Sequence, residues 1–266
     1  MTAHALLSVG RRMHHATGRA KISRTMSASV RDQIRYVRPV VPVHFPATDP
    51  EWDLGQNTLH GRLCELLYQV LVATLGPEHT VSDDQFVYYD ASNPRLKCAP
   101  DVFVKLGTPQ AHFASWKTWE DGVPELCVEI LSPSDMEKLT LDQKLTRYLA
   151  IGVQEVLVLD PALAPGTRLR AWDRVDGDLV ERVVERERTP CVTLGLHWVL
   201  TFDDALATDA LRLATDAEGE HLVLTRDEAS TAAATAHANA ERARADRAEA
   251  EAARLRDELA RLQKKR

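Results

Sequence analysis

Apolar residues recur at helical spacing between residues 57 and 75. Leucine and valine side chains lie three and four positions apart, at Leu59, Leu63, Leu66, Leu67, Val70 and Leu71. Such a stripe covers one broad face of a helix. Gly76-Pro77 follows directly, and because this pair disfavours further helical turns, we expect the helix to end there.

The pattern then changes to short, strand-like segments. Gln85–Tyr89 and Asp101–Leu106 are rich in β-branched and aromatic residues, which favours strands. Leu126–Leu131 is an apolar run interrupted by Glu129, as in a central strand that is covered on both faces. Glu155–Leu159 is a second run of this kind.

A helix is expected between these two apolar runs. Ser134 and Glu137 have the spacing of a capping box, which marks a helix start. Gly152 suits the C-terminal end of the helix. The apolar face consists of Leu141, Leu145 and Leu149. Residues 126–160 therefore predict a strand–helix–strand unit.

The second half of the chain predicts further strands. Val175-Asp176-Gly177-Asp178 separates two apolar segments, Leu169–Arg174 and Leu179–Val184, which indicates a β-hairpin. Short strands are expected near Trp198–Phe202, Leu211–Leu213 and His221–Leu224. The fold class is therefore α/β, with β-hairpins added to the strand–helix–strand unit.

From about residue 225 the chain becomes Ala-rich and charged, without Gly or Pro. Residues spaced alternately by three and four form a coiled-coil seam, interrupted at Glu241. The seam consists of Ala238, Ala245, Ala248, Ala252, Leu255, Leu259 and Leu262. Its first half is weak because alanine buries little surface. We expect a partner chain, giving a homo-oligomer, or the domain surface to support this helix.

The predicted organisation has three parts. Residues 36–225 form the folded domain and residues 226–266 the C-terminal Ala-rich coiled-coil helix. Residues 1–35 are expected to be a disordered or irregular extension. Because the first 31 residues contain six Lys and Arg and no acid, they also resemble a transit peptide, and Met26 is an alternative start to Met1.

Composition limits the function classes further. The net charge of -6 counts weakly against a dedicated nucleic-acid binder, which usually carries a basic surplus. No apolar run approaches the roughly 20 residues that cross a bilayer, so we expect no membrane segment. The cysteines are Cys64, Cys98, Cys127 and Cys191. Without a CxxC pair, they predict buried thiols in a reducing cytoplasm rather than disulfides or zinc ligands.

Two carboxylates in apolar strands are the strongest chemical signal. Asp101 begins one predicted strand and Glu129 lies inside another. A buried carboxylate is costly unless it is paired, protonated or bound to a metal. Two of them on adjacent strands could hold Mg²⁺, with Mn²⁺ as a substitute. A buried ion pair for Glu129 and a turn role for Asp101 are the alternatives.

A lysine on the following helix completes this hypothesis. Thr140, Lys144 and Tyr148 are spaced by four and share one helix face. That face borders the leucine stripe, so the Lys144 amine could reach back to Glu129. There it could orient an attacking water and stabilise negative charge on phosphorus.

The segments around these residues resemble the Uma-two family of restriction-type endonucleases. They are Cys98-Ala99-Pro100-Asp101, Val128-Glu129-Ile130-Leu131-Ser132-Pro133-Ser134 and Lys144-xxx-Tyr148-xxx-Gly152-Val153-x-Glu155. The resemblance spans roughly 55–225. It implies a restriction-endonuclease-like mixed β-sheet core flanked by helices, of the PD-(D/E)XK nuclease superfamily.

The resemblance also implies roles for single residues. Asp101 and Glu129 would be metal ligands. Lys144 would replace the lysine that normally follows the glutamate by two residues, where this chain has Leu131. His60 matches a family position, although a packing histidine is favoured there. A hairpin that many members carry before the first helix is replaced by Trp52-Asp53-Leu54-Gly55-Gln56-Asn57.

Three further polar residues are weaker candidates. Glu65 shares the first helix with His60, but it lies five positions away and faces differently. Asp84 and Gln85 stand at a strand entrance near the predicted site. For each of the three, a solvated surface role is favoured.

The leading functional hypothesis is a Mg²⁺-dependent endonuclease that acts on DNA. The alternative is an assembly or binding protein that keeps the fold without cleaving and oligomerises through the tail. A hydrolase of RNA or of a small phosphodiester is a third hypothesis, because a fold does not define its substrate. Sequence specificity and biological role stay open.

Overall fold

The computed structural model describes residues 58–132 and 139–264. Four helices and twelve strands lie in these two ranges. The helices are α4 (Thr58–Leu75), α5 (Thr118–Asp121), α6 (Leu141–Ile151) and α7 (Arg226–Gln263). The expected helix over 57–75 is thus present as α4.

The largest sheet has six strands and carries the core. Its spatial order is β1 (Thr80–Asp83), β4 (Val102–Lys105), β6 (Leu126–Ile130), β7 (Glu155–Leu159), β8 (Leu169–Val175) and β9 (Asp178–Arg182). The β6 and β7 strands are parallel, and the other neighbours are antiparallel. The sheet is therefore mixed, which confirms the predicted fold class.

Two three-stranded sheets accompany it. One has the order β3 (Lys97–Cys98), β2 (Val87–Tyr88) and β5 (Trp116–Lys117). The other has the order β10 (Arg188–Cys191), β11 (Leu196–Asp203) and β12 (Thr208–Ala214).

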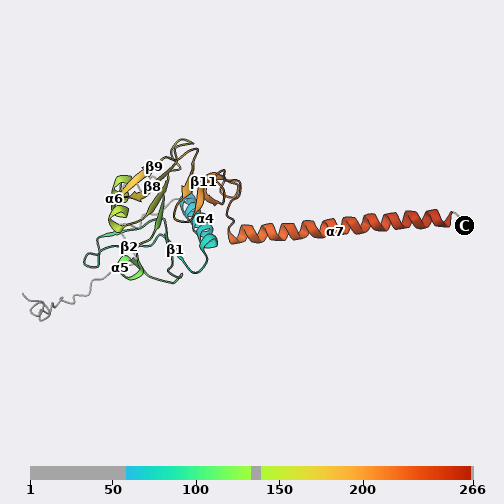
Figure 1. Cartoon of the computed structure of the whole chain (residues 1–266), viewed down its shortest axis with the longest axis horizontal. Helices are drawn as coiled ribbons and strands as arrows, with labels where there is room; N and C mark the ends of the chain where they lie inside the picture. The colour runs from blue at the N-terminus through green and yellow to red at the C-terminus, as the bar shows by residue number, and fades with distance from the viewer. Residues whose placement is uncertain (1–57, 133–138, 265–266) are drawn as a thin grey trace, which may run out of the picture. The chain divides into compact units, whose positions relative to one another are not determined.

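The six-stranded sheet is covered on both faces, and side chains alternate between them along each strand. On β4, Val102 and Val104 join one apolar cluster, together with Leu67 and other residues of α4. Phe103 between them joins a second cluster, which contains Tyr148 of α6. The α4 and α6 helices therefore pack on opposite faces (Figure 1).

The strand–helix–strand unit forms as expected, with a different helix start. The α6 helix is capped by Thr140, whose side chain accepts from the Gln143 amide while the Gln143 side chain bonds the Thr140 amide. The Ser134–Glu137 capping box lies outside the described residues. Gly152 ends the helix in the left-handed conformation, as predicted.

The predicted hairpin is present as β8 and β9. Its two loop residues, Asp176 and Gly177, both have positive φ, which is typical of a type I′ turn.

Two short segments differ from what the sequence predicted. No helix or strand was predicted over residues 107–123, but this segment contains β5 and α5, because Trp116 is buried and β5 pairs with β2. Residues 221–224 make one isolated bridge, Leu222 to Ala214, instead of a strand. The Asp216 carboxylate holds this segment in a turn by accepting from the Glu220 and His221 amides.

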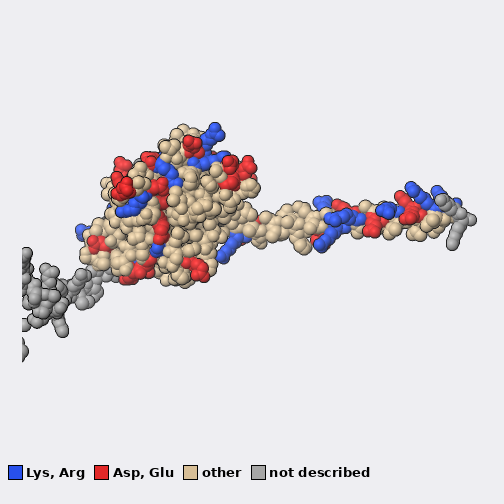
Figure 2. All heavy atoms as spheres, viewed as in Figure 1, with Lys and Arg blue, Asp and Glu red and all other residues tan. Residues whose placement is uncertain are grey.

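The C-terminal helix α7 begins at a second capping box, formed by Thr225 and Glu228. The Glu228 carboxylate also pairs with the buried Arg212 of β12, so the first turn of α7 is bonded to the small sheet. The seam leucines Leu255, Leu259 and Leu262 are exposed. Figure 2 shows a stretch without charged side chains near the start of this helix and mixed charges further along it.

The structure also bears on the cysteines and on membrane-crossing helices. All four cysteines are buried and free, as expected. Among the residues that the structure describes, no helix combines the length and apolar character needed to cross a membrane.

Candidate active site

The register between β4 and β6 brings the two predicted carboxylates together. Val102 pairs with Val128 across these antiparallel strands. Asp101 directly precedes β4, and its side chain bonds the amide of Ile130, the residue that follows Glu129 on β6. Asp101 contacts His60 of α4, whereas Glu129 contacts Lys144 of α6. The sheet thus brings two acids that are distant in the sequence to neighbouring positions, and the negative charge of Asp101 acts on Glu129.

Asp101 is buried, with 8% of its surface exposed, and it has two partners for its side chain. Its Oδ2 accepts a hydrogen bond of 2.6 Å from the Ile130 amide. Its Oδ1 lies 3.2 Å from Nε2 of His60. These contacts hold the carboxylate between β6 and α4.

Glu129 is almost completely buried, at 1% exposure, and α6 supplies both partners of its carboxylate. Lys144 Nζ lies 2.6 Å from Oε2, and the Tyr148 hydroxyl donates to Oε1. Burial raises the pKa of Glu129 to about 7, opposed by the Lys144 charge and reinforced by Asp101. Glu129 therefore exchanges its proton near neutral pH.

Tyr148 stays a hydrogen-bond donor in this environment. Burial raises the pKa of Tyr148 well above its usual value, and the neighbouring Glu129 raises it further. The hydroxyl therefore keeps its proton at neutral pH and can orient Glu129. Because Lys144 and Tyr148 are one helical turn apart, a single helix face positions both.

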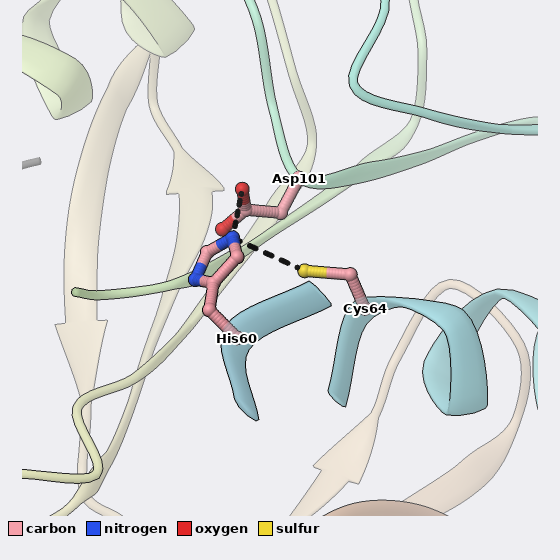
Figure 3. A group of neighbouring side chains, drawn as sticks. All are labelled: His60, Cys64 and Asp101. Atoms are coloured by element: carbon pink, nitrogen blue, oxygen red, sulfur yellow. Dashed lines mark hydrogen bonds and ion pairs between the residues drawn. The ribbon is translucent and has the colours of Figure 1, made fainter. Parts of the chain in front are cut away.

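On the other side of Asp101, α4 contributes two buried residues, His60 and Cys64 (Figure 3). Cys64 Sγ lies 3.3 Å from His60 Nε2. Burial raises the pKa of the Cys64 thiol, and the charges of Asp101 and Glu129 raise it further. The sequence predicted Cys64 only as a buried thiol. Its spacing of four from His60 was the signal that both share one helix face.

The weaker candidates lie differently. Glu65 is exposed and accepts a hydrogen bond from Gln69 one turn further along α4. Asp84 is exposed, and its amide donates to the Asp101 carbonyl. Gln85 is half-buried in the segment before β2. The contacts of Asp101 and Glu129 described above involve neither Glu65 nor Gln85.

Leu131 occupies the position where the family resemblance implies a lysine. Leu131 is buried and packs in the apolar cluster on the α6 face of the sheet. The amine beside Glu129 comes from Lys144 on α6 instead. The positively charged Lys144 amine therefore lies beside Glu129, although Lys144 is on α6 and not two residues after Glu129 on β6.

Fold and site together define a mixed α/β domain with two neighbouring carboxylates and a lysine close to its central strands. The chain belongs to the Uma2 (Uma-two) family. Its family model, described as "Putative restriction endonuclease", matches residues 54–203. The expected resemblance is confirmed.

Solved structures and curated proteins provide two further comparisons. The crystal structure of a "putative nuclease belonging to DUF820" from Anabaena variabilis is similar, with a TM-score of 0.36 and 13% identity. The match covers 58% of this chain and 76% of that chain. A search of curated proteins finds no match.

Proposed function

We propose that this protein is a metal-dependent endonuclease that hydrolyses phosphodiester bonds in DNA. The observation that carries the proposal is the proximity of Asp101, which bonds the Ile130 amide, to Glu129, with the Lys144 amine 2.6 Å from the glutamate. Membership of a family described as a restriction endonuclease supports the same class of reaction.

The donor set suits a small, hard cation. Two carboxylates from neighbouring strands are the oxygen ligands that Mg²⁺ uses, and Mn²⁺ accepts the same ligands. We infer that Asp101 and Glu129 would hold this ion. When bound, it would polarise the scissile phosphate and lower the pKa of a coordinated water.

The other residues would support this centre. The Ile130 amide restrains Asp101, and Tyr148 restrains Glu129, so both carboxylates are oriented in advance. The Lys144 ammonium favours the ionised form of Glu129 that a cation needs. We infer that its remaining protons stabilise negative charge on the phosphate and orient the attacking water.

A cleavage assay on plasmid DNA tests the proposal. We expect the purified full chain to cut with Mg²⁺ or Mn²⁺ and to be inactive with EDTA. Asp101→Asn keeps an acceptor for the Ile130 amide but removes the charge, and it should lower the rate at least a hundredfold. Glu65→Gln changes an exposed carboxylate of α4 and should cut normally. Equal cleavage by all three proteins would refute the mechanism.

One observation favours a second candidate, an assembly protein that does not cleave. Both Glu129 oxygens already have protein partners, as in a structural ion pair, and α7 presents an exposed seam. Calorimetric titration with Mg²⁺ and Mn²⁺ separates the two. The absence of metal binding, together with oligomers that depend on the tail, would favour assembly.

A further inference from the structure

His60, Cys64 and Asp101 bring three different ligand atoms to one place (Figure 3). An imidazole nitrogen, a thiol sulfur and a carboxylate oxygen all lie within 4.8 Å of one another. All three residues are buried, at 3%, 8% and 8% exposure. We propose that they form a second cation position, for a borderline transition metal of the Zn²⁺ class.

Two of the three separations fit tetrahedral coordination, and the third, from the Cys64 sulfur to the Asp101 carboxylate, is within 4.8 Å. Zinc binds sulfur at about 2.3 Å and nitrogen or oxygen at about 2.0–2.2 Å, which separates neighbouring ligand atoms by roughly 3.4–3.6 Å. The observed separations are 3.3 Å from Cys64 Sγ to His60 Nε2 and 3.2 Å from that nitrogen to Asp101 Oδ1. Small side-chain adjustments are enough to admit an ion, with the fourth position open to water.

The same geometry argues against a nucleophilic cysteine triad. Such a triad uses both nitrogens of the imidazole, one toward the nucleophile and one toward the acid. Here Cys64 and Asp101 contact the same nitrogen, Nε2. A neutral imidazole nitrogen carries either a proton or a lone pair, so Nε2 cannot donate to Asp101 and at the same time act as the base for the Cys64 thiol. An ion at the common point would bind all three.

This second cation position differs from the proposed magnesium site in the types of its ligand atoms. Mg²⁺ prefers oxygen ligands alone, whereas imidazole and thiolate suit Zn²⁺ and the related ions Co²⁺ and Fe²⁺. The thiol releases its proton to solvent when it binds the ion. Asp101 belongs to both sets of ligands.

This shared aspartate has a consequence that rests on the proposed function. An ion held by His60, Cys64 and Asp101 would draw the carboxylate toward α4 and away from Glu129. Micromolar Zn²⁺ should therefore inhibit Mg²⁺-dependent cleavage. Cys64→Ser should be less sensitive to this inhibition, because it lacks the sulfur ligand.

Cobalt provides a direct test on the full chain, because a thiolate bound to Co²⁺ gives an intense near-ultraviolet charge-transfer absorption. We expect this absorption to saturate at one Co²⁺ per chain and Zn²⁺ to displace it. Cys64→Ser should abolish it. Cys191→Ser is the matched control, because that buried thiol lies beside Glu155, and it should retain the absorption.

The outcomes are distinguishable from those of the cleavage assay. No charge-transfer band in the natural chain, or an equal band in Cys64→Ser, would overturn the second cation position whatever the cleavage result. A band that depends on Cys64 supports it even if no DNA is cut. Circular dichroism checks that Cys64→Ser is folded, and Cys64→Ala provides a second variant with the same expected loss.

Discussion

At the scale of single residues, the ion pair of Glu129 and Lys144 combines a fully buried carboxylate with a largely buried amine. Removing one member of a buried pair leaves an uncompensated charge, which costs about 3 kcal/mol of stability. Lys144→Met should therefore destabilise the protein by about that amount at pH 8, as measured by urea unfolding.

The double variant Lys144→Met/Glu129→Gln is the control for this prediction. It removes both charges and keeps a hydrogen-bond acceptor for Tyr148, so most of the lost stability should return. The two single changes would then be strongly non-additive, as expected for groups in direct contact. Additive losses would contradict the pairing.

The raised pKa of Glu129, about 7, predicts how metal binding depends on pH. A protonated carboxyl does not bind a cation, so Glu129 must lose its proton first. The raised pKa moves the increase in affinity from near pH 4.5 to near pH 7. Affinity for Mg²⁺ should be about tenfold lower at pH 6 than at pH 8.

Isothermal calorimetry at the two pH values measures this difference. Glu129→Gln should bind Mg²⁺ weakly at both pH values, because a neutral amide is a poorer ligand than a carboxylate and its charge does not change with pH. If the affinity of the natural chain is the same at pH 6 and pH 8, Glu129 is not the ligand that titrates.

The sequence predicted the two acids of the candidate site from their positions in apolar segments. Asp101 and Glu129 are acids in apolar strands, and such acids need a partner. The neighbourhood of His60 and Cys64 was not predictable in the same way. A histidine and a cysteine on an apolar helix face are both compatible with ordinary packing, and their contact with Asp101 depends on how α4 meets the sheet.

At the scale of elements, α6 is the part of the fold that positions the amine and the hydroxyl. Its capping box begins at Thr140, one turn before Lys144. Thr140→Ala removes the bond to the Gln143 amide and should cost about 1 kcal/mol. The expected DNA-cleavage rate is also lower, because the first turn then frays close to Lys144.

A second threonine of the same helix is the control. The Thr146 hydroxyl donates to the Asp142 carbonyl on the exposed face, a bond that adds little to helix stability. Thr146→Ala should leave both the urea midpoint and cleavage almost unchanged. Equal destabilisation by the two changes would show that the cap has no special role.

Some helices, strands and turns could be predicted from their own residues, and others could not. The α4 stripe and the Asp176-Gly177 turn carry strong local signals. The strand predicted over Gln85–Tyr89 is present as the shorter β2. The two-residue strands β3 and β5 are too short for a periodic pattern and form because β2 lies beside them. The cap of α6 at Thr140 was not predicted, and the predicted Ser134–Glu137 capping box lies outside the described residues.

At the scale of the whole molecule, the sheet determines which distant segments meet. Its order places β4 beside β6, and this pairing brings residues 101 and 129 near each other. Sequence patterns predicted these two strands, but strand order depends on pairing between distant segments. The resemblance to a known family supplied that part of the expectation.

The exposed seam of α7 leads to a prediction about assembly. We expect the full chain to form oligomers, because Leu255 and Leu259 are exposed apolar residues at coiled-coil spacing. The double change Leu255→Glu/Leu259→Glu should yield monomers in sedimentation experiments. Ala253→Glu, beside the seam, should leave the oligomers intact. A monomeric natural chain at micromolar concentration would refute the prediction.

The central claim is that Asp101 and Glu129 together hold one divalent ion. Crystals grown with Mn²⁺ and measured for anomalous scattering test it most directly. We predict a peak at bonding distance from one oxygen of each carboxylate, with Lys144 close by. Mn²⁺-saturated crystals that have no peak between these residues, and in which Glu129 still bonds Lys144 and Tyr148, would contradict the claim.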